Sequence, residues 1–77
     1  MTEFAILFKF LRERTGMSAR ALSLQAGLSQ SYISKVESGN VLLTIESFAK
    51  IIKLMNITDK ELMYLIFSLL PKDSNEN

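Results

Sequence analysis

Two short stretches with helical patterning lie only three residues apart, and this spacing constrains the fold more than any other feature of the sequence. The residues between them are Gly27, Leu28 and Ser29. Glycine commonly ends a helix in the left-handed conformation, and serine commonly begins one by accepting a backbone N–H bond. Two helices joined by so short a turn cross steeply rather than lie antiparallel. We therefore expect a steeply crossed pair of helices at residues 18–26 and 30–38.

The apolar residues of this pair support the steep crossing. Leu22 and Ala26 lie four residues apart on one face of the first helix, and Ile33 and Val36 form the inner face of the second. Ser23 lies four residues before the glycine, where a small side chain lets the two helices approach closely. Each observation is weak alone, but together they form a helix-turn-helix signature.

Glycine, proline and capping residues divide the rest of the chain into three further helical segments. Gly16 ends the first of them. Thr58 and Glu61 form a T-x-x-E capping box that opens the last, and Pro71 ends it. The expected ranges are 2–14, 45–55 and 58–70.

These segments predict an all-α fold of five helices. No stretch alternates with period two over a useful length, although residues 40–45 are β-branched enough to stay ambiguous. A chain of 77 residues allows one small domain. We place that domain at residues 1–71 and expect residues 72–77 to be a frayed polar tail.

The composition excludes several classes of protein. The chain contains neither cysteine nor histidine, so we expect no disulfide, no metal site and no Ser-His-Asp enzyme. We expect no catalytic residue, no cofactor and no small-molecule ligand. The longest apolar run, at residues 62–67, is too short to span a bilayer. These features predict a cytoplasmic, non-enzymatic protein with no membrane partner.

Residues 7–54 resemble the Cro/CI-type, or phage repressor-like, helix-turn-helix family of transcription factors. The resemblance is densest over LSLQAGLSQSYISKVESG, residues 22–39. In that family the first helix carries an Arg four residues before a Gly, and the third helix ends in Glu-x-Gly. The matching residues here are Arg12 and Glu37. The resemblance implies a lambda-repressor-like DNA-binding domain in which these two residues form a partly buried ion pair.

The resemblance also implies that the helix at 30–38 enters the major groove of double-stranded DNA. The residues that face away from its inner side, and are expected to contact bases, are Gln30, Ser31, Ser34 and Lys35. Glutamine can present a donor–acceptor edge to adenine, and lysine can donate to guanine. The residues expected to bind phosphate are Arg20, Ser29, Tyr32, Ser38 and Asn40.

Two positions depart from the family pattern. The second helix usually begins with a phosphate-binding Gln, and here that position is Ala19. The loop after the third helix is usually basic with a Pro, and here residues 40–43 read Asn-Val-Leu-Leu. With a net charge of only +1, these departures leave a rival function open. That rival is a protein-interaction module, such as an antitoxin or anti-repressor, built on the same fold.

The family binds DNA as dimers on two half-sites about one turn apart. The last helix has a stripe that can pack on the core of its own domain, formed by Leu62, Leu65, Ile66 and Leu69. The apolar residues on its other faces, which we expect to form a homodimer interface, are Met63, Tyr64, Phe67 and Leu70. Phe4 and Phe8 are more often core residues than interface residues at such positions, so we expect them in the core, with assistance to the dimer interface as the alternative. The sequence thus predicts a dimeric regulator that occupies an operator, as a phage or plasmid repressor, a restriction–modification controller or an antitoxin.

Overall fold

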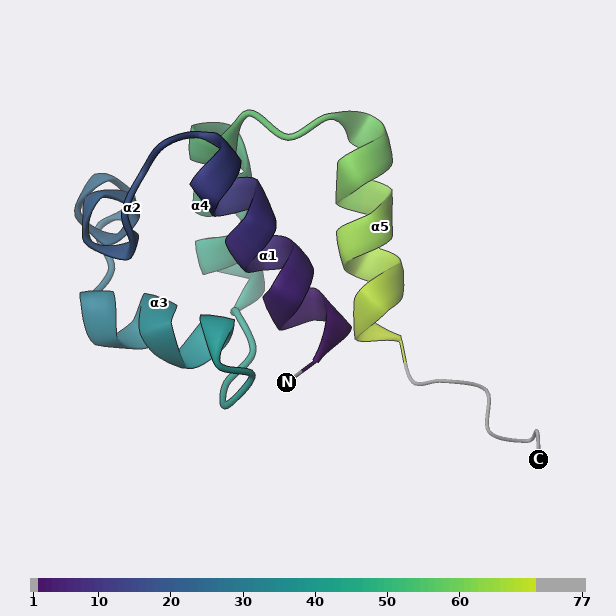
Figure 1. Cartoon of the computed structure of the whole chain (residues 1–77), viewed down its shortest axis with the longest axis horizontal. Coiled ribbons are helices and arrows are strands. Elements are labelled where there is room, and N and C mark those ends of the chain that lie inside the picture. The colour runs from purple at the N-terminus through teal and green to yellow at the C-terminus, as the bar shows by residue number, and fades with distance from the viewer. Residues whose placement is uncertain (1, 71–77) are drawn as a thin grey trace.

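The computed structural model describes residues 2–70 as five α-helices (Figure 1). They are α1 (Glu3–Arg14), α2 (Ala19–Ala26), α3 (Gln30–Glu37), α4 (Ile45–Met55) and α5 (Asp59–Leu69). The predicted all-α, five-helix fold is confirmed, and the ambiguous residues 40–45 form a loop and the start of α4. Pro71, expected to end the last helix, and the tail at 72–77 lie outside the described residues. Within residues 2–70, no helix has the length and apolarity needed to cross a bilayer.

Each helix begins at a hydroxyl side chain that accepts a hydrogen bond from the backbone N–H three residues ahead. These N-cap residues are Thr2, Ser18, Ser29, Thr44 and Thr58. The carboxylate of Glu61 also accepts a bond of 3.0 Å from the N–H of Thr58, which completes the predicted capping box. Because these caps are local, the helix boundaries expected from the sequence hold to within one residue.

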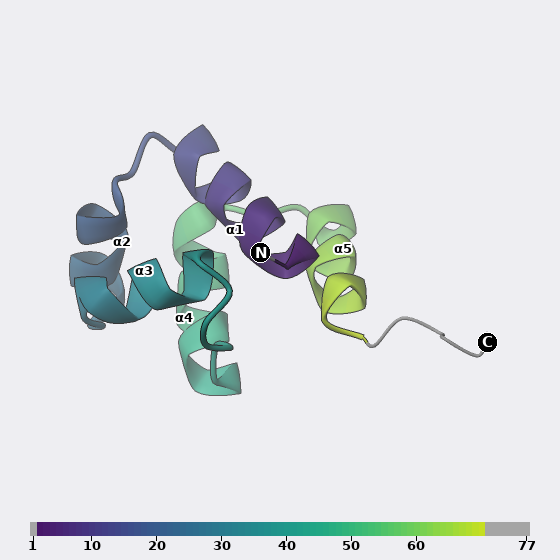
Figure 2. The same cartoon turned by 60° about the horizontal axis from the view of Figure 1, so that its bottom comes forward.

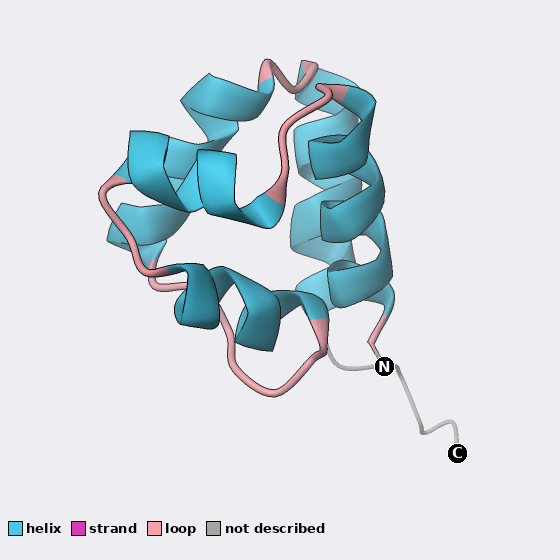
Figure 3. Ribbon diagram, turned by 60° about the vertical axis from the view of Figure 1, so that its left-hand side comes forward, coloured by secondary structure: helices cyan, strands magenta, loops and turns pink. Residues whose placement is uncertain are grey.

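The steeply crossed pair α2 and α3 forms one end of the molecule and α5 the other, with α1 and α4 between them (Figures 1 and 2). Every helix contributes to one core. Its fully buried large side chains are Phe8, Leu11, Leu22, Ile33, Val36, Ile51, Met55 and Leu65. Figure 3, which brings the α2–α3 end forward, shows helices and loops throughout the described chain. The core therefore holds α3 from behind and leaves its outer face at the surface.

Phe4 and Phe8 lie in the core, as expected, so the alternative in which they assist dimerisation is wrong. Their relative exposures are 3% and 0%. Their rings stack with centroids 5.9 Å apart, and the ring of Phe48 from α4 meets Phe4 edge-on. Because α1 lies in the middle of the domain, its aromatic face is needed for the core.

Half of the apolar stripe expected to bury on α5 lies at the surface, and Leu62 is only partly buried. Leu65 is fully buried, but Ile66 and Leu69 each remain 43% exposed. The reason is that α5 packs chiefly against one helix, α1, rather than between two. A helix with a single neighbour buries a narrow row of side chains, so the outer surface of α5 is more apolar than the sequence predicts.

An exposed ion pair joins the end of α1 to the start of α5. The guanidinium of Arg14 donates to both carboxylate oxygens of Glu61, with 3.0 Å between Nη2 and Oε1. These bonds, followed by the bond from the N–H of Thr58, lower the pKa of Glu61 from its ordinary 4.5 to about 2. The ionised carboxylate therefore stabilises the fold above pH 4.5, and this contribution is lost as the pH falls toward 2.

Glu61→Gln should flatten the dependence of stability on pH in this acidic window. Glutamine can still cap Thr58 but has no charge to lose. We expect urea unfolding between pH 4.5 and pH 2 to show a smaller loss of stability for the variant than for the wild type. Glu46→Gln, an exposed change on α4, is the matched control. If the free energy of unfolding fell equally with pH for Glu61→Gln and the wild type, the ion pair with Arg14 would not be what keeps the Glu61 carboxylate ionised.

Candidate nucleic-acid interface

The turn between α2 and α3 is closed by backbone hydrogen bonds around a left-handed glycine. Gly27 has φ of 70°, a conformation that side chains other than glycine adopt at a cost. The N–H of Leu28 donates to the carbonyl oxygen of Ser23 at 2.8 Å. The hydroxyl of Ser23, itself buried, donates to the carbonyl oxygen of Arg20 at 2.7 Å. The small serine thus fits between the helices with its polar group satisfied, and the turn sets the direction of α3.

The outer face of α3 carries a continuous polar surface, which we call the recognition ridge. On the inner face, Ile33 and Val36 are 0% and 1% exposed. The ridge consists of Gln30, Ser31, Ser34 and Lys35, all of them exposed. Their spacing places them on one side of the helix, so the structure brings together all four residues expected to contact bases.

The residues expected to bind phosphate lie around the ends of α3 and at the start of α2. Arg20, Ser29, Ser38 and Asn40 are exposed. The hydroxyl of Ser29 accepts the capping bond from Tyr32 at 3.0 Å, so its own proton remains available to a phosphate oxygen. The hydroxyl of Ser38 instead donates to the carbonyl oxygen of Lys35 at 3.0 Å. Because a phosphate offers only acceptors, Ser38 must give up that bond to contact one.

The hydroxyl of Tyr32 has a second role that the sequence did not indicate. It accepts a bond of 3.1 Å from the N–H of Thr44 and donates to the carbonyl oxygen of Leu42 at 3.4 Å. These contacts tie the loop before α4 to the recognition helix. The contact to Leu42 is long, so the phenol proton can turn toward a phosphate while the bond from Thr44 remains.

A buried ion pair fixes the far end of α3 to α1. Arg12 donates to both oxygens of Glu37, at 2.5 Å from Nε to Oε2 and 3.0 Å from Nη2 to Oε1. Its Nη1 also donates to the carbonyl oxygen of Met17 at 2.7 Å. The relative exposures of Arg12 and Glu37 are 7% and 8%. Hydrogen bonding to Glu37 is the largest influence on the pKa of Arg12 and raises it above its ordinary value. The pair implied by the family resemblance is thus present and orients the recognition ridge.

The surface around the ridge carries little positive charge. Between residues 18 and 46, all of which the structure describes, the cations are Arg20 and Lys35. The loop before α4 instead presents apolar side chains, since Leu42 is 68% exposed and Ile45 is 87% exposed. The sequence of this loop indicated its missing basic residues but not the exposure of these two side chains. The donors that this surface offers are therefore mainly neutral.

The residues expected to form a dimer interface are all at the surface. Met63 and Tyr64 are 53% and 58% exposed, and Phe67 and Leu70 are 56% and 59% exposed. No group of three potential metal-ligating side chains occurs in the part of the chain that the structure describes.

Comparisons with known proteins agree with this geometry. A helix-turn-helix family model matches residues 8–62. The structure is similar to that of the restriction-modification controller protein C.AhdI from Aeromonas hydrophila, with 28% identity over 79% of this chain and 92% of that chain and a TM-score of 0.72. It is also similar to the wild-type restriction-modification controller protein C.Esp1396I, with 28% identity, 91% and 93% coverage and a TM-score of 0.73. No curated protein sequence matches the chain significantly.

The matched region contains the whole helix-turn-helix, the recognition ridge and both residues of the buried ion pair. The match covers well over half of the chain, and the similarity to C.Esp1396I covers 91% of it. The chain therefore belongs to the Cro/CI-type, lambda-repressor-like helix-turn-helix family of DNA-binding transcriptional regulators.

Proposed function

We propose that this protein is a dimeric repressor that binds a palindromic operator through α3 and controls transcription by occupying it. The observation that carries this proposal is the recognition ridge, whose polar side chains are all exposed on a helix held rigidly from behind. The similarity to restriction-modification controllers supports the control of a restriction–modification operon, including its own gene, as the setting.

Sequence is recognised by the ridge in the major groove. Gln30 can form two hydrogen bonds with adenine, and Lys35 can donate to O6 and N7 of guanine. Ser31 and Ser34 can donate to or accept from either kind of base pair. The surrounding residues set the register of the helix by contacting phosphates, and they are Arg20, Ser29, Tyr32, Ser38 and Asn40.

A dimer is needed because one short helix contacts too few base pairs for a specific site. The exposed face of α5 supplies a surface for it, formed by Met63, Tyr64, Phe67 and Leu70. A small monomer that left such a face in water would be prone to associate. Selection of bound sequences from random DNA should therefore return a palindrome whose half-sites are about 10 base pairs apart, centre to centre. A single unrepeated half-site would contradict the proposed dimer.

The salt dependence of binding should be shallow for a DNA-binding dimer. The slope of log affinity against log salt concentration is about −0.9 for each phosphate neutralised. With Arg20 as the cation assigned to phosphate, two protomers should give a slope of about −2. Fluorescence anisotropy over a salt series measures it. A much steeper slope would show that other cations contact the DNA.

The same titration tests the rival function, a protein-interaction module such as an antitoxin or anti-repressor. The low charge near the ridge and the exposed Leu42 and Ile45 favour this rival. A protein of that kind should show no retention on any DNA, even at low salt. Binding with the expected slope would rule the rival out as the sole function.

Gln30→Ala should relax base preference at one position in each half-site. The expected loss is about 1–3 kcal/mol of discrimination against the wrong base, because alanine offers no polar edge to adenine. Competition binding with operators that differ at single positions measures the change. Gln25→Ala, an exposed change on α2, is the matched control. Uniform weakening on all DNA would instead assign Gln30 to phosphate contacts.

A further inference from the structure

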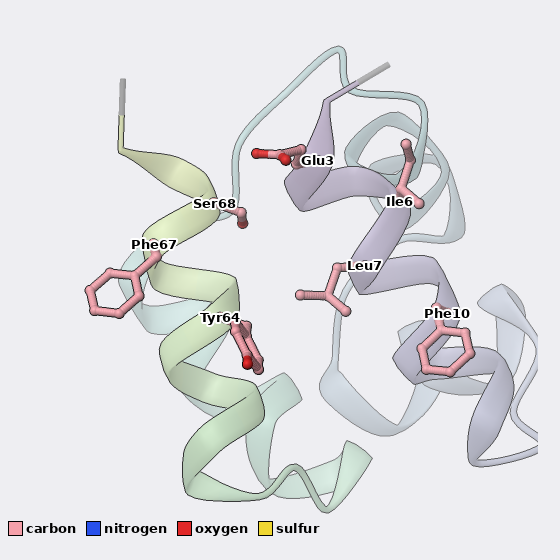
Figure 4. Close-up of a pocket in the computed structure, with 7 residues that line it drawn as sticks. All are labelled: Glu3, Ile6, Leu7, Phe10, Tyr64, Phe67 and Ser68. Atoms are coloured by element: carbon pink, nitrogen blue, oxygen red, sulfur yellow. The ribbon is translucent and has the colours of Figure 1, made fainter. Parts of the chain in front are cut away.

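Large apolar side chains are exposed in two separate parts of the described chain. Most of them belong to α1 and α5, where a groove of about 620 Å³ runs between the two helices (Figure 4). That groove adjoins the face of α5 already proposed for the dimer. The other large apolar side chains exposed within residues 2–70 are Leu24, Leu42 and Ile45. The last two belong to the chain that follows the recognition helix, and the proposed function gives them no role.

The loop between α3 and α4 is tied to the recognition helix at both of its ends. The N–H groups of Asn40 and Val41 donate to the carbonyl oxygen of Lys35, at 2.9 and 3.4 Å. The N–H of Thr44 donates to the hydroxyl of Tyr32 at 3.1 Å. Since Tyr32 and Lys35 both belong to α3, these bonds fix the position of the loop relative to the recognition ridge.

Leu42 points away from the domain because its two neighbours pack into it. Val41 and Leu43 are half-buried and contact the core. Such alternation is typical of extended chain, and Leu42 between them is 68% exposed. Ile45 begins α4 and is 87% exposed. Leu42 and Ile45, which we call the loop pair, therefore present apolar surface beside the recognition ridge.

We propose that the loop pair binds the C5-methyl group of a thymine at the edge of each half-site. This inference rests on the proposed binding of α3 in the major groove and adds a contact to it. The base edges in the major groove carry hydrogen-bonding groups, and the thymine methyl group is the apolar group among them. 5-Methylcytosine carries a methyl group on the same ring carbon, so the loop pair accepts that base in place of thymine.

The small size of the loop pair favours a methyl group over a protein partner. A protein interface buries about 800 Å² on each partner and uses about 20–30 residues a side. Two side chains are enough to cover one methyl group, whose burial strengthens binding about fourfold. With Arg20 and Lys35 as the cations between residues 18 and 46, an apolar contact also adds affinity that salt does not screen.

The test replaces thymine by uracil, which lacks the methyl group and keeps every hydrogen-bonding group. The probes are operator duplexes, recovered by selection from random DNA, in which each thymine is replaced in turn by deoxyuridine in both half-sites. At one position the wild-type protein should bind about 15-fold more weakly, because each half-site loses one methyl contact. Competition fluorescence anisotropy measures this uracil penalty.

The double variant Leu42→Asn/Ile45→Thr should lose the uracil penalty. Both substitutions keep the approximate size of the side chain but make it polar, so no apolar surface remains for the methyl group. Both positions are exposed, and thermal unfolding should show that the variant is folded. Leu24→Asn is the matched control, because it makes the same change at a leucine of α2 that is also 68% exposed. This control should keep the full penalty.

Cytosine provides a second measurement at the position that responds to uracil. Replacing the thymine–adenine pair by cytosine–guanine should weaken binding of the wild type. Methylation of that cytosine at C5 should then recover about fourfold in affinity for each half-site. The double variant should not distinguish cytosine from 5-methylcytosine.

The outcomes distinguish this inference from the proposed function. If the wild type binds its operator and no thymine responds to uracil, methyl recognition is overturned while DNA binding by α3 stands. If the double variant is weakened but keeps the uracil penalty, the loop pair contacts the sugar–phosphate backbone instead. If it binds every duplex as the wild type does, the loop pair does not contact DNA and is left for a protein partner. A wild type that is retained on no DNA would overturn the proposed function itself.

Discussion

Arg12→Met should lower the free energy of unfolding by about 3 kcal/mol, because it leaves the buried carboxylate of Glu37 without its partner. Both oxygens of that carboxylate now accept hydrogen bonds from the guanidinium. The substitution also removes the donor to the carbonyl oxygen of Met17. Urea unfolding at neutral pH measures the loss. Protein concentration must be held constant, since the proposed dimerisation would add to the apparent stability.

The double variant Arg12→Met/Glu37→Leu should be more stable than Arg12→Met alone. Its buried positions are then apolar, and no uncompensated charge remains in the core. Arg14→Met makes the same change at an exposed ion pair. It should lower the free energy of unfolding much less, because water solvates the carboxylate of Glu61 that it leaves behind. If Arg12→Met and Arg14→Met cost the same, the buried pair does not stabilise the position of α3.

Phe67→Glu should convert the protein to a monomer and weaken operator binding by about 10²–10⁴-fold. Phe67 is 56% exposed on α5 and lies between Met63, Tyr64 and Leu70 in the proposed interface. A carboxylate at this position would be buried against apolar side chains on association. Binding of one protomer would then no longer raise the effective concentration of the second at the neighbouring half-site. Sedimentation and operator titration measure the two effects.

Leu24→Glu controls for the introduction of an acidic residue at an exposed apolar site. Leu24 is 68% exposed on α2, away from α5, and its replacement should leave the oligomeric state unchanged. An acidic residue near DNA repels the phosphates and so weakens binding by itself. This control is therefore used for the sedimentation measurement and not for the operator titration. A monomeric Phe67→Glu protein with undiminished operator affinity would show that one recognition helix is sufficient.

The helix boundaries and the recognition ridge were predictable because they depend on neighbours in the sequence. A serine or threonine cap bonds a backbone N–H three residues ahead, and Gly27 adopts its left-handed conformation within the turn that it forms. The outer face of α3 follows from the helical repeat once Ile33 and Val36 are known to face the core. Arg12 and Glu37 are 25 residues apart, and only the family resemblance connected them.

The environment of α5 was decided by tertiary structure. The helical repeat shows which residues share a face, but the width of the buried face depends on how many helices pack against it. The chief neighbour of α5 is α1. On α5, Leu65 alone is therefore fully buried, and Ile66 and Leu69 stay half exposed. The position of α1 in the middle of the fold likewise placed Phe4 in the core. Local hydrogen bonding therefore set the helices and the polar ridge, whereas the number and placement of packing partners set which apolar surface of the domain was left exposed.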